Sequence, residues 1–321
     1  MYEPYYGLNE RPFDLSPNPR FLFLSNTHRE ALTHLRYGLT GRPGLTVLIG
    51  EAGTGKTTLV RAALQHSKGP SPHSGIVHLS NPTLTRSEFF EYLSAGFGFT
   101  AEAASSKTRF LREVESAISS YAANNAVLAL VVDEAQSLPH ELLEEIRLLT
   151  NVEVPSGQSL AVALVGQPEL GDRLNEPRLR QLKQRIALRC ELAALDLRET
   201  AAYIAARVRI AGGRAELLFT REAVVAIHEC SKGIPRTISV ICDNALVNGF
   251  AADIKPVGRD LVLEVCRDFQ FGGALVGERA DSQPSFSQPA GSAAARNRPP
   301  QSENPDSMFG RFMRTRRFSF F

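Results

Sequence analysis

The chain has 321 residues, of which 43% are hydrophobic and 22% are charged, and its formal net charge is +2 at pH 7. These values are ordinary for a globular protein with a sizeable core, and the near-neutral charge excludes the strong basic field of a dedicated nucleic-acid binder. The four cysteines lie far apart in the sequence, which favours buried thiols in a reducing compartment over a zinc site or a disulfide framework.

The first residues and the hydrophobic runs bear on the location of the protein. The N-terminus has neither the basic stretch nor the apolar stretch of a secretory signal. No apolar run approaches the ~20 residues that cross a bilayer. We therefore expect a cytoplasmic protein, or one that is peripheral at the inner membrane.

The first 26 residues are rich in tyrosine, phenylalanine and proline. Proline restricts itself and the residue before it to extended or turn conformations, so we expect an extended segment that packs on the core of the following domain. From Thr27 to Leu39 the apolar residues recur at helical spacing. This pattern predicts an amphipathic helix that ends near Gly41.

The stretch from Gly50 to Thr57 matches the phosphate-loop pattern G-x-x-x-x-G-K-[ST] at every fixed position. An apolar run at 45–49 precedes it and a helical pattern at 58–64 follows, which is the strand-to-helix context that the motif requires. Glycines let the backbone curl so that successive N–H groups point at phosphate oxygens, and the start of the helix adds a positive field. A plain glycine-rich turn is the alternative; the flanking elements favour a nucleoside triphosphate site.

The residues of this loop have predicted roles in binding ATP and Mg²⁺. Lys56 would reach the β- and γ-phosphates, and the Thr57 hydroxyl would hold Mg²⁺. The predicted nucleotide-binding residues here are Gly50, Glu51, Ala52, Gly53, Thr54, Gly55, Lys56, Thr57 and Thr58.

After the loop, short apolar runs alternate with helical patterns. The patterns predict strands at 75–79, 127–132 and 159–165, and helices at 87–97, 107–123 and 139–150. The continuous apolar run at 127–132 is typical of a strand that is buried on both faces. The fold class predicted by this alternation is α/β, a P-loop parallel sheet with helices on both faces.

Polar side chains directly follow two of the predicted strands. Asp133 and Glu134 follow strand 127–132, where a nucleotide hydrolase needs one carboxylate for Mg²⁺ and another to polarise the attacking water. Gln167 follows strand 159–165, so in a parallel sheet its amide would emerge at the same edge, near the γ-phosphate or the water. Solvated carboxylates at a strand end and a polar strand cap are the alternatives.

Four arginines lie in a stretch that runs from a helix into a short apolar piece, 186–188. A cation placed against the negative charge that develops in the transition state of hydrolysis strongly accelerates the reaction. In assemblies a neighbouring subunit can supply this cation. Among Arg178, Arg180, Arg185 and Arg189 we favour Arg185, with Arg180 second. A solvated basic face is the alternative.

Beyond about Leu195 the strand patterns stop and only helical patterns remain. The predicted helices are 197–211, 220–230, 235–250 and 258–269, which form a small all-helical lid domain. Gly233 and Pro235 form a rigid turn at a helix start that could aim Arg236 at the γ-phosphate. A plain capping turn is the alternative.

The last fifty residues differ in character from the rest. Glycine, serine, proline, glutamine and asparagine dominate the region from 271, which predicts a disordered tail. Residues 308–321 interleave arginine with phenylalanine. They could dock peripherally on an anionic membrane or in a partner groove, and an end without function is the alternative.

These features together resemble the AAA+ ATPases. The resemblance implies ATP hydrolysis with Mg²⁺ by a homo-oligomer with a helical lid. It assigns Asp133-Glu134 to Walker B, Gln167 to sensor 1, Arg185 to the arginine finger, and Gly233-Ile234-Pro235-Arg236 to sensor 2.

A narrower resemblance is to the subfamily of general secretion pathway protein A and the ATPases of exopolysaccharide and exosortase loci. It rests on Tyr5-Tyr6-Gly7-Leu8, Pro12-Phe13 and the segments 17–21, 28–32 and 142–151. Subfamily members that act in secretin assembly continue into a transmembrane helix and a peptidoglycan-binding domain, and this sequence has neither. The resemblance therefore favours the cytoplasmic, export-locus branch.

The expected domains are an N-terminal segment (1–26), an AAA+ nucleotide-binding domain (27–195), a helical lid (196–270) and a tail (271–321). The implied role is to drive or regulate assembly of an envelope secretion or polysaccharide-export system, with an inner-membrane component as partner and no nucleic acid. Two alternatives stay open. One is a DNA-associated ATPase of the transposition or replication-initiator type, and the other is a nucleotide-dependent scaffold with little hydrolysis.

Overall fold

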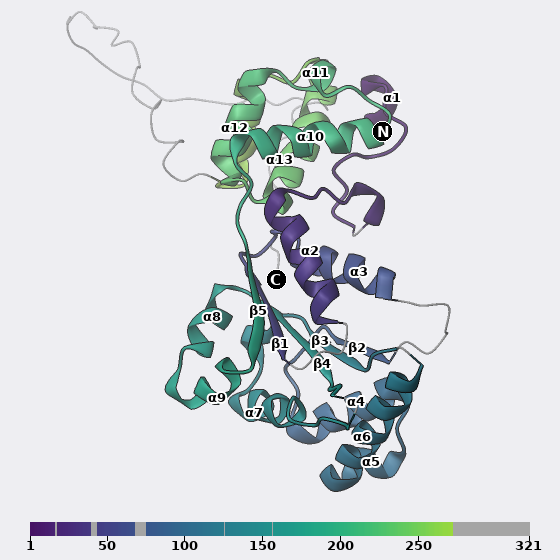
Figure 1. The fold of residues 1–321 in the computed structure, drawn as a ribbon. Helices are drawn as coiled ribbons and strands as arrows, with labels where there is room; N and C mark the ends of the chain where they lie inside the picture. The colour runs from purple at the N-terminus through teal and green to yellow at the C-terminus, as the bar shows by residue number, and fades with distance from the viewer. Residues whose placement is uncertain (17, 40–43, 68–74, 125, 156, 272–321) are drawn as a thin grey trace, which may run out of the picture. The chain divides into compact units, whose positions relative to one another are not determined.

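Five parallel strands form one sheet in the computed structural model, which describes residues 1–271 except 17, 40–43, 68–74, 125 and 156. The strand order is β2-β3-β4-β1-β5 (Figure 1), so β1 is paired on both sides. Parallel pairing brings the carboxyl ends of the strands to one edge. The strands are β1 (Leu45–Gly50), β2 (Ile76–Leu79), β3 (Ala129–Val132), β4 (Ala161–Gly166) and β5 (Ile186–Leu192).

Helices cover both faces of this sheet, which confirms the predicted fold class. Alternate strand residues face opposite sides: Leu130 and Leu164 join the hydrophobic cluster on one face, whereas Ala129 and Ala163 join the cluster on the other. The second face carries α2 (Asn26–Gly38) and α3 (Lys56–Ser67). The first face carries α4 (Arg86–Phe97), α5 (Ala101–Ser105), α6 (Lys107–Ala123), α7 (His140–Leu149), α8 (Pro168–Leu174) and α9 (Arg180–Lys183).

Strand β5 and the shortest helices were not predicted from the sequence. Only the apolar piece 186–188 indicated β5, because an edge strand alternates buried and exposed residues and here includes Arg189 and Glu191. Helices α5, α8 and α9 have four to seven residues, too few to show a helical period. Two single 3₁₀ turns of this part are η2 (Ala135–Ser137) and η3 (Pro177–Leu179), and another, η1 (Pro19–Phe21), lies in the N-terminal segment.

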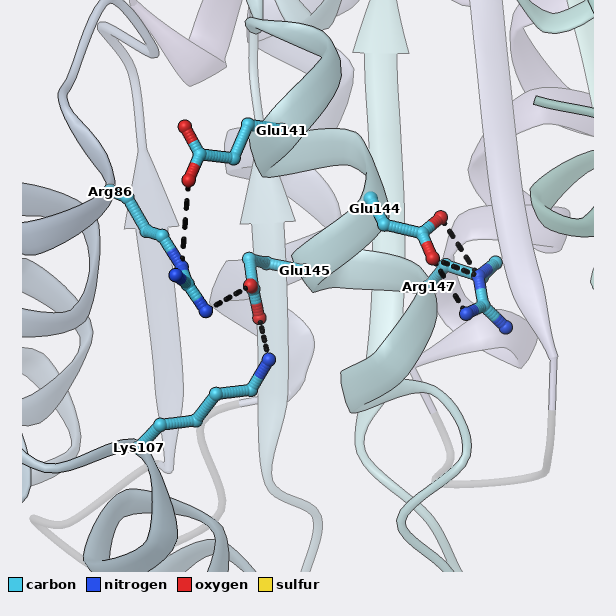
Figure 2. Close-up of polar contacts among 6 residues, drawn as sticks. All are labelled: Arg86, Lys107, Glu141, Glu144, Glu145 and Arg147. Atoms are coloured by element: carbon cyan, nitrogen blue, oxygen red, sulfur yellow. Dashed lines mark hydrogen bonds and ion pairs between the residues drawn. The ribbon is translucent and has the colours of Figure 1, made fainter. Parts of the chain in front are cut away.

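A buried glutamate joins three helices on the first face of the sheet. Glu145 of α7 is 5% exposed, and its two oxygens pair with Arg86 of α4 at 2.7 Å and with Lys107 of α6 at 2.6 Å (Figure 2). Glu141, one turn earlier, lies 3.7 Å from Arg86. The carboxylate therefore fixes the starts of α4 and α6 against α7.

The helical part after β5 has its own hydrophobic cluster. The Asp196 side chain begins its first helix with a capping box completed by Glu199. The helices are α10 (Leu197–Ile210), α11 (Ala215–Leu218), α12 (Arg221–Ser231), α13 (Pro235–Ala251) and α14 (Arg259–Asp268). The all-helical character predicted for this region is thus observed.

The N-terminal segment differs in one respect from the extended conformation predicted for it. Residues Glu3–Tyr6 form a helix, α1, rather than extended chain, because proline is tolerated in a first helical turn and Gly7 ends the helix at φ +70°. The buried aromatic residues of the segment, including Tyr2 and Phe13, belong to the cluster of the helical part and not to either cluster of the sheet. The aromatic side chains of the segment therefore pack on the helical part, whereas Leu22 and Leu24 near its end pack against the cluster on the second face of the sheet.

The described residues all lie within one compact unit, so the division at 195 stays a prediction. The tail from 272 onward, including 308–321, lies outside the described residues. None of the helices within the described ranges is long and apolar enough to cross a membrane.

Candidate nucleotide-binding site

The phosphate loop connects the end of β1 to the start of α3, as the motif requires. Gly53 and Gly55 have φ values of +82° and +98°, which glycine adopts without steric cost. The Lys56 side chain is 5% exposed, and its Nζ donates to the carbonyls of Gly50 at 2.8 Å and Glu51 at 3.0 Å. Burial lowers the pKa of Lys56. The nearby carboxylates of Glu134 and Asp133 act in the opposite direction, because they favour the charged ammonium.

The structure brings together Thr57 and Asp133, the two residues predicted to hold Mg²⁺. The Thr57 hydroxyl donates to Asp133 Oδ2 at 2.7 Å. Asp133 is 3% exposed, and its Oδ1 accepts the backbone N–H of Glu134 at 3.0 Å. A hydroxyl and a carboxylate are hard oxygen donors of the kind that Mg²⁺ prefers, so these residues fit the ion.

Glu134 occupies a left-handed backbone conformation at φ +52°, which is uncommon for a residue other than glycine. Two side-chain amides donate to its Oε2: Gln136 at 2.6 Å and Gln167 at 3.2 Å. Burial acts to raise the pKa of Glu134, but the two amides and Lys56 together hold it below its ordinary value. The carboxylate is therefore ionised, as a group that polarises water must be.

Gln136 is a site residue to which the sequence interpretation gave no role. Its Oε1 accepts the backbone N–H of Gln167 at 3.0 Å, and its backbone carbonyl accepts from Arg173. It thereby links the loop after β3 to the end of β4. The sequence offered one indication of this role: Gln136 is a polar residue two positions after Glu134, in a loop at the carboxyl ends of the strands.

The turn that precedes α13 lies directly on the phosphate loop. The Arg236 N–H donates to the Gly53 carbonyl at 3.2 Å. A Cβ at Gly53 would lie 2.9 Å from the Arg236 Cβ, so only glycine leaves room for this approach. Gly233, at φ +73°, accepts the Leu195 N–H at 2.9 Å. The predicted sensor arginine is thus anchored beside the loop through its backbone.

A cavity of about 360 Å³ lies beside the loop. Its lining brings together predicted residues from the phosphate loop, the loop after β3 and the helical part: Ala52, Gly53, Gly55, Lys56, Thr57, Thr58, Glu134 and Arg236. Residues of the N-terminal segment, among them Asp14 and Phe21, complete the lining. The sequence interpretation did not place this segment at the site.

Arg207 of α10 holds the N-terminal segment at the cavity. Its guanidinium donates to the backbone carbonyls of Pro12 at 2.5 Å and Asp14 at 3.0 Å, and lies 5.0 Å from the centre of the Phe21 ring. A guanidinium presents several donors in one plane and also stacks on aromatic rings. Nothing in the local sequence pattern distinguished this arginine from its neighbours.

The arginines predicted to act on a neighbouring site lie away from this cavity. Arg185 precedes β5, and its carbonyl accepts the N–H of Leu45 at the start of β1, which is the sheet edge opposite the phosphate loop. Arg185 and Arg180 are both exposed. Within the described chain, neither lines the cavity beside Lys56.

Comparisons with known proteins relate this chain to the AAA family. Residues 39–174 match the model of the AAA domain family. Over 252 residues, 78% of this chain, the sequence is 41% identical to general secretion pathway protein A of Aeromonas hydrophila, and it spans 45% of that relative's length.

Solved structures with the same fold include two archaeal proteins. The ORC2 protein of Aeropyrum pernix, in ADPNP–ADP complexes, is similar with a TM-score of 0.56 at 16% identity, over 86% of this chain and 73% of its own. Cdc6p of Pyrobaculum aerophilum is similar with a TM-score of 0.57 at 13% identity, over 80% of this chain and 70% of its own. At these identities the similarity shows the fold alone.

Proposed function

Because the chain contains an AAA domain and has the AAA+ fold, we propose that it binds ATP with Mg²⁺ and hydrolyses it. The observation that carries the proposal is the convergence of Lys56, the Thr57–Asp133 pair and Glu134 at one edge of the sheet, beside a cavity. These groups supply a cation, hard oxygen ligands and an ionised carboxylate, which are the parts that phosphoryl transfer to water requires.

Each group has a distinct task in this proposal. Lys56 exchanges its two loop carbonyls for the β- and γ-phosphate oxygens. Thr57 and Asp133 would hold Mg²⁺, which would supply positive charge to the phosphates. Glu134 accepts a proton from the attacking water, while Gln167 and Gln136 orient its carboxylate.

The proposal extends to a homo-oligomer. Arg185, exposed at the opposite sheet edge, would complete the site of a neighbouring subunit, with Arg180 as the second candidate, and Arg236 would sense the γ-phosphate from the helical part. Added Arg185→Ala subunits would then lower the turnover of wild-type protein in mixed oligomers. Turnover that falls only in proportion to the wild-type fraction would contradict action between subunits.

Two substitutions test the enzymatic proposal. Lys56→Ala removes the phosphate cation and is expected to abolish ATP binding measured by titration calorimetry. Glu134→Gln keeps the shape of the side chain but not its basicity, so ATP should still bind while phosphate release falls by about 10² or more. Equal turnover in Glu134→Gln and wild type would contradict hydrolysis through this carboxylate.

The proposed cellular role follows from the relative in Aeromonas. The chain is 41% identical to a general secretion pathway protein. We therefore propose that it drives or regulates assembly of an envelope secretion or polysaccharide-export system. It would work in the cytoplasm or peripherally at the inner membrane, with a membrane component of that system as partner. Affinity purification from cells with and without bound ATP analogue would identify that component.

The two other roles make different predictions. A DNA-associated ATPase would shift DNA in a gel in a salt-dependent and nucleotide-dependent manner. A scaffold would bind ATP but, even with its partner, release no more phosphate than the Glu134→Gln variant. Either outcome would replace the secretion-linked proposal.

A further inference from the structure

A buried histidine of α2 contacts the phosphate loop from the side of the N-terminal segment. His28 is 4% exposed, and its Nε2 lies 2.9 Å from the backbone carbonyl oxygen of Thr54, which is itself fully buried. The ring lies against the loop: a Cβ at Gly55 would be 3.6 Å from the same nitrogen. The tasks proposed above for the catalytic groups do not use this contact.

The partners of the ring determine which nitrogen carries the proton. A carbonyl oxygen only accepts, so Nε2 must be the donor. Nδ1 then accepts from the Ser25 hydroxyl at 2.7 Å, and Ser25 Oγ in turn accepts the His28 N–H at 3.3 Å as the cap of α2. Burial lowers the pKa of His28, in agreement with a neutral ring. The helix cap therefore fixes both the tautomer and the orientation of the imidazole.

The direction of the Thr54 carbonyl sets the direction of the next N–H. A trans peptide is planar, so its C=O and N–H point to opposite sides. With the Thr54 carbonyl held by His28, the Gly55 N–H is directed away from α2. The preceding carbonyl, of Gly53, is held from another side by the Arg236 N–H at 3.2 Å. Two successive peptide planes of the loop are thus fixed by groups outside it.

We propose that His28 is a positioning residue that keeps the peptide between Thr54 and Gly55 oriented for phosphate binding, an inference that rests on the nucleotide site proposed above. Both ring nitrogens are occupied by Ser25 and the Thr54 carbonyl, so the imidazole acts through the backbone of the loop. The phosphate groups of a bound nucleotide contribute to its affinity through this loop. That contribution should therefore depend on a hydrogen-bond donor at position 28.

The test compares ADP binding by variants that keep or lose the donor. His28→Phe keeps an aromatic ring without a donor and should weaken ADP about tenfold, the effect of one buried hydrogen bond. His28→Gln restores a donor and should recover most of the affinity. His34→Phe, the same change on the same helix, should bind ADP as the wild type does, since His34 contacts Cys190 and not the loop.

The outcomes separate this inference from the proposed function. Wild-type protein that binds neither ADP nor ATP would overturn the proposed function and the inference with it. Wild-type affinity in His28→Phe, or no recovery in His28→Gln, would overturn the inference alone. Should His28→Phe fail to fold, nitrogen NMR of the wild type reports the tautomer directly, and a ring protonated at Nδ1 and not at Nε2 would overturn it equally.

Discussion

At the scale of single residues, the site is held together by hydrogen bonds among its own polar groups. Lys56 donates to loop carbonyls, Thr57 to Asp133, and two glutamines to Glu134. An unpaired buried polar group costs about 1–3 kcal/mol, so these contacts stabilise the positions of the reactive groups.

The first prediction concerns Gln136. Leucine at this position removes the 2.6 Å hydrogen bond to Glu134 and the contact with the Gln167 N–H. We expect Gln136→Leu to lower the turnover number about tenfold or more and to leave the ATP dissociation constant within about threefold, because the residue orients the carboxylate and not the phosphates. Steady-state phosphate release and calorimetry measure the two effects. The control is Gln181→Leu on exposed α9, and unchanged turnover in Gln136→Leu would refute the role.

The second prediction concerns the pH dependence of stability. The pKa of His28 is lowered by burial, despite opposing effects of the Thr54 carbonyl and Glu199, whereas in the unfolded chain it stays near ~6.5. Below that pH the unfolded state binds a proton that the folded state does not, so stability falls as the pH decreases, until the folded pKa is passed. The slope is at most about 1.4 kcal/mol per pH unit.

Urea unfolding at several pH values checks this expectation. The stability advantage of the wild type over His28→Gln should shrink between pH ~7.5 and ~5.5, because the variant has no proton to take up at this position. A constant difference across that range would show that His28 is not the group responsible.

At the scale of elements, α7 has two tasks. Its start follows Asp133 and Glu134, and its buried carboxylate, Glu145, holds the starts of α4 and α6 (Figure 2). The first face of the sheet is thus joined by ion pairs as well as by hydrophobic contact. The Glu144–Arg147 ion pair, at 2.6 Å, joins two residues of the same helix.

The third prediction compares two carboxylates of this helix. Glu145→Gln removes the negative charge opposite Arg86 and Lys107 and should destabilise the protein by about 1–3 kcal/mol. Breaking a fully buried ion pair would cost more, but here both cations are partly solvated. Glu141→Gln, with a carboxylate that is 62% exposed, should change stability by less than about 0.5 kcal/mol. Denaturant midpoints measure both, and equal effects would contradict the importance of burial.

At the scale of the whole molecule, the N-terminal segment belongs to the helical part and also lines the nucleotide cavity. Tyr2 donates to Asp243 of α13, and Arg207 of α10 holds the backbone around Pro12. Segments about 200 residues apart in the sequence therefore form one wall of the site. Substitutions in the N-terminal segment, far from the phosphate loop in sequence, should consequently affect nucleotide binding.

The fourth prediction tests this attachment. Phe13 is 1% exposed in the cluster of the helical part, so Phe13→Ala should destabilise the protein by about 3–5 kcal/mol and weaken ATP binding. Leu15→Ala, at 53% exposure in the same segment, should cost less than about 1 kcal/mol. Thermal unfolding measures the stabilities, and a Phe13→Ala protein as stable as Leu15→Ala would refute the packing described.

The sequence by itself determined the phosphate loop, the carboxylates after β3 and the alternation of buried strands with helices, because these depend on local patterns and on the parallel-sheet rule that strand ends share an edge. Only the tertiary structure decided where the N-terminal segment packs and that Gln136 and His28 serve the site. Their contacts join residues from different elements, and a hydrogen bond between segments leaves no periodic trace in the sequence. Edge strand β5 was missed for a related reason, since its exposed side lacks the hydrophobic residues that mark a buried strand.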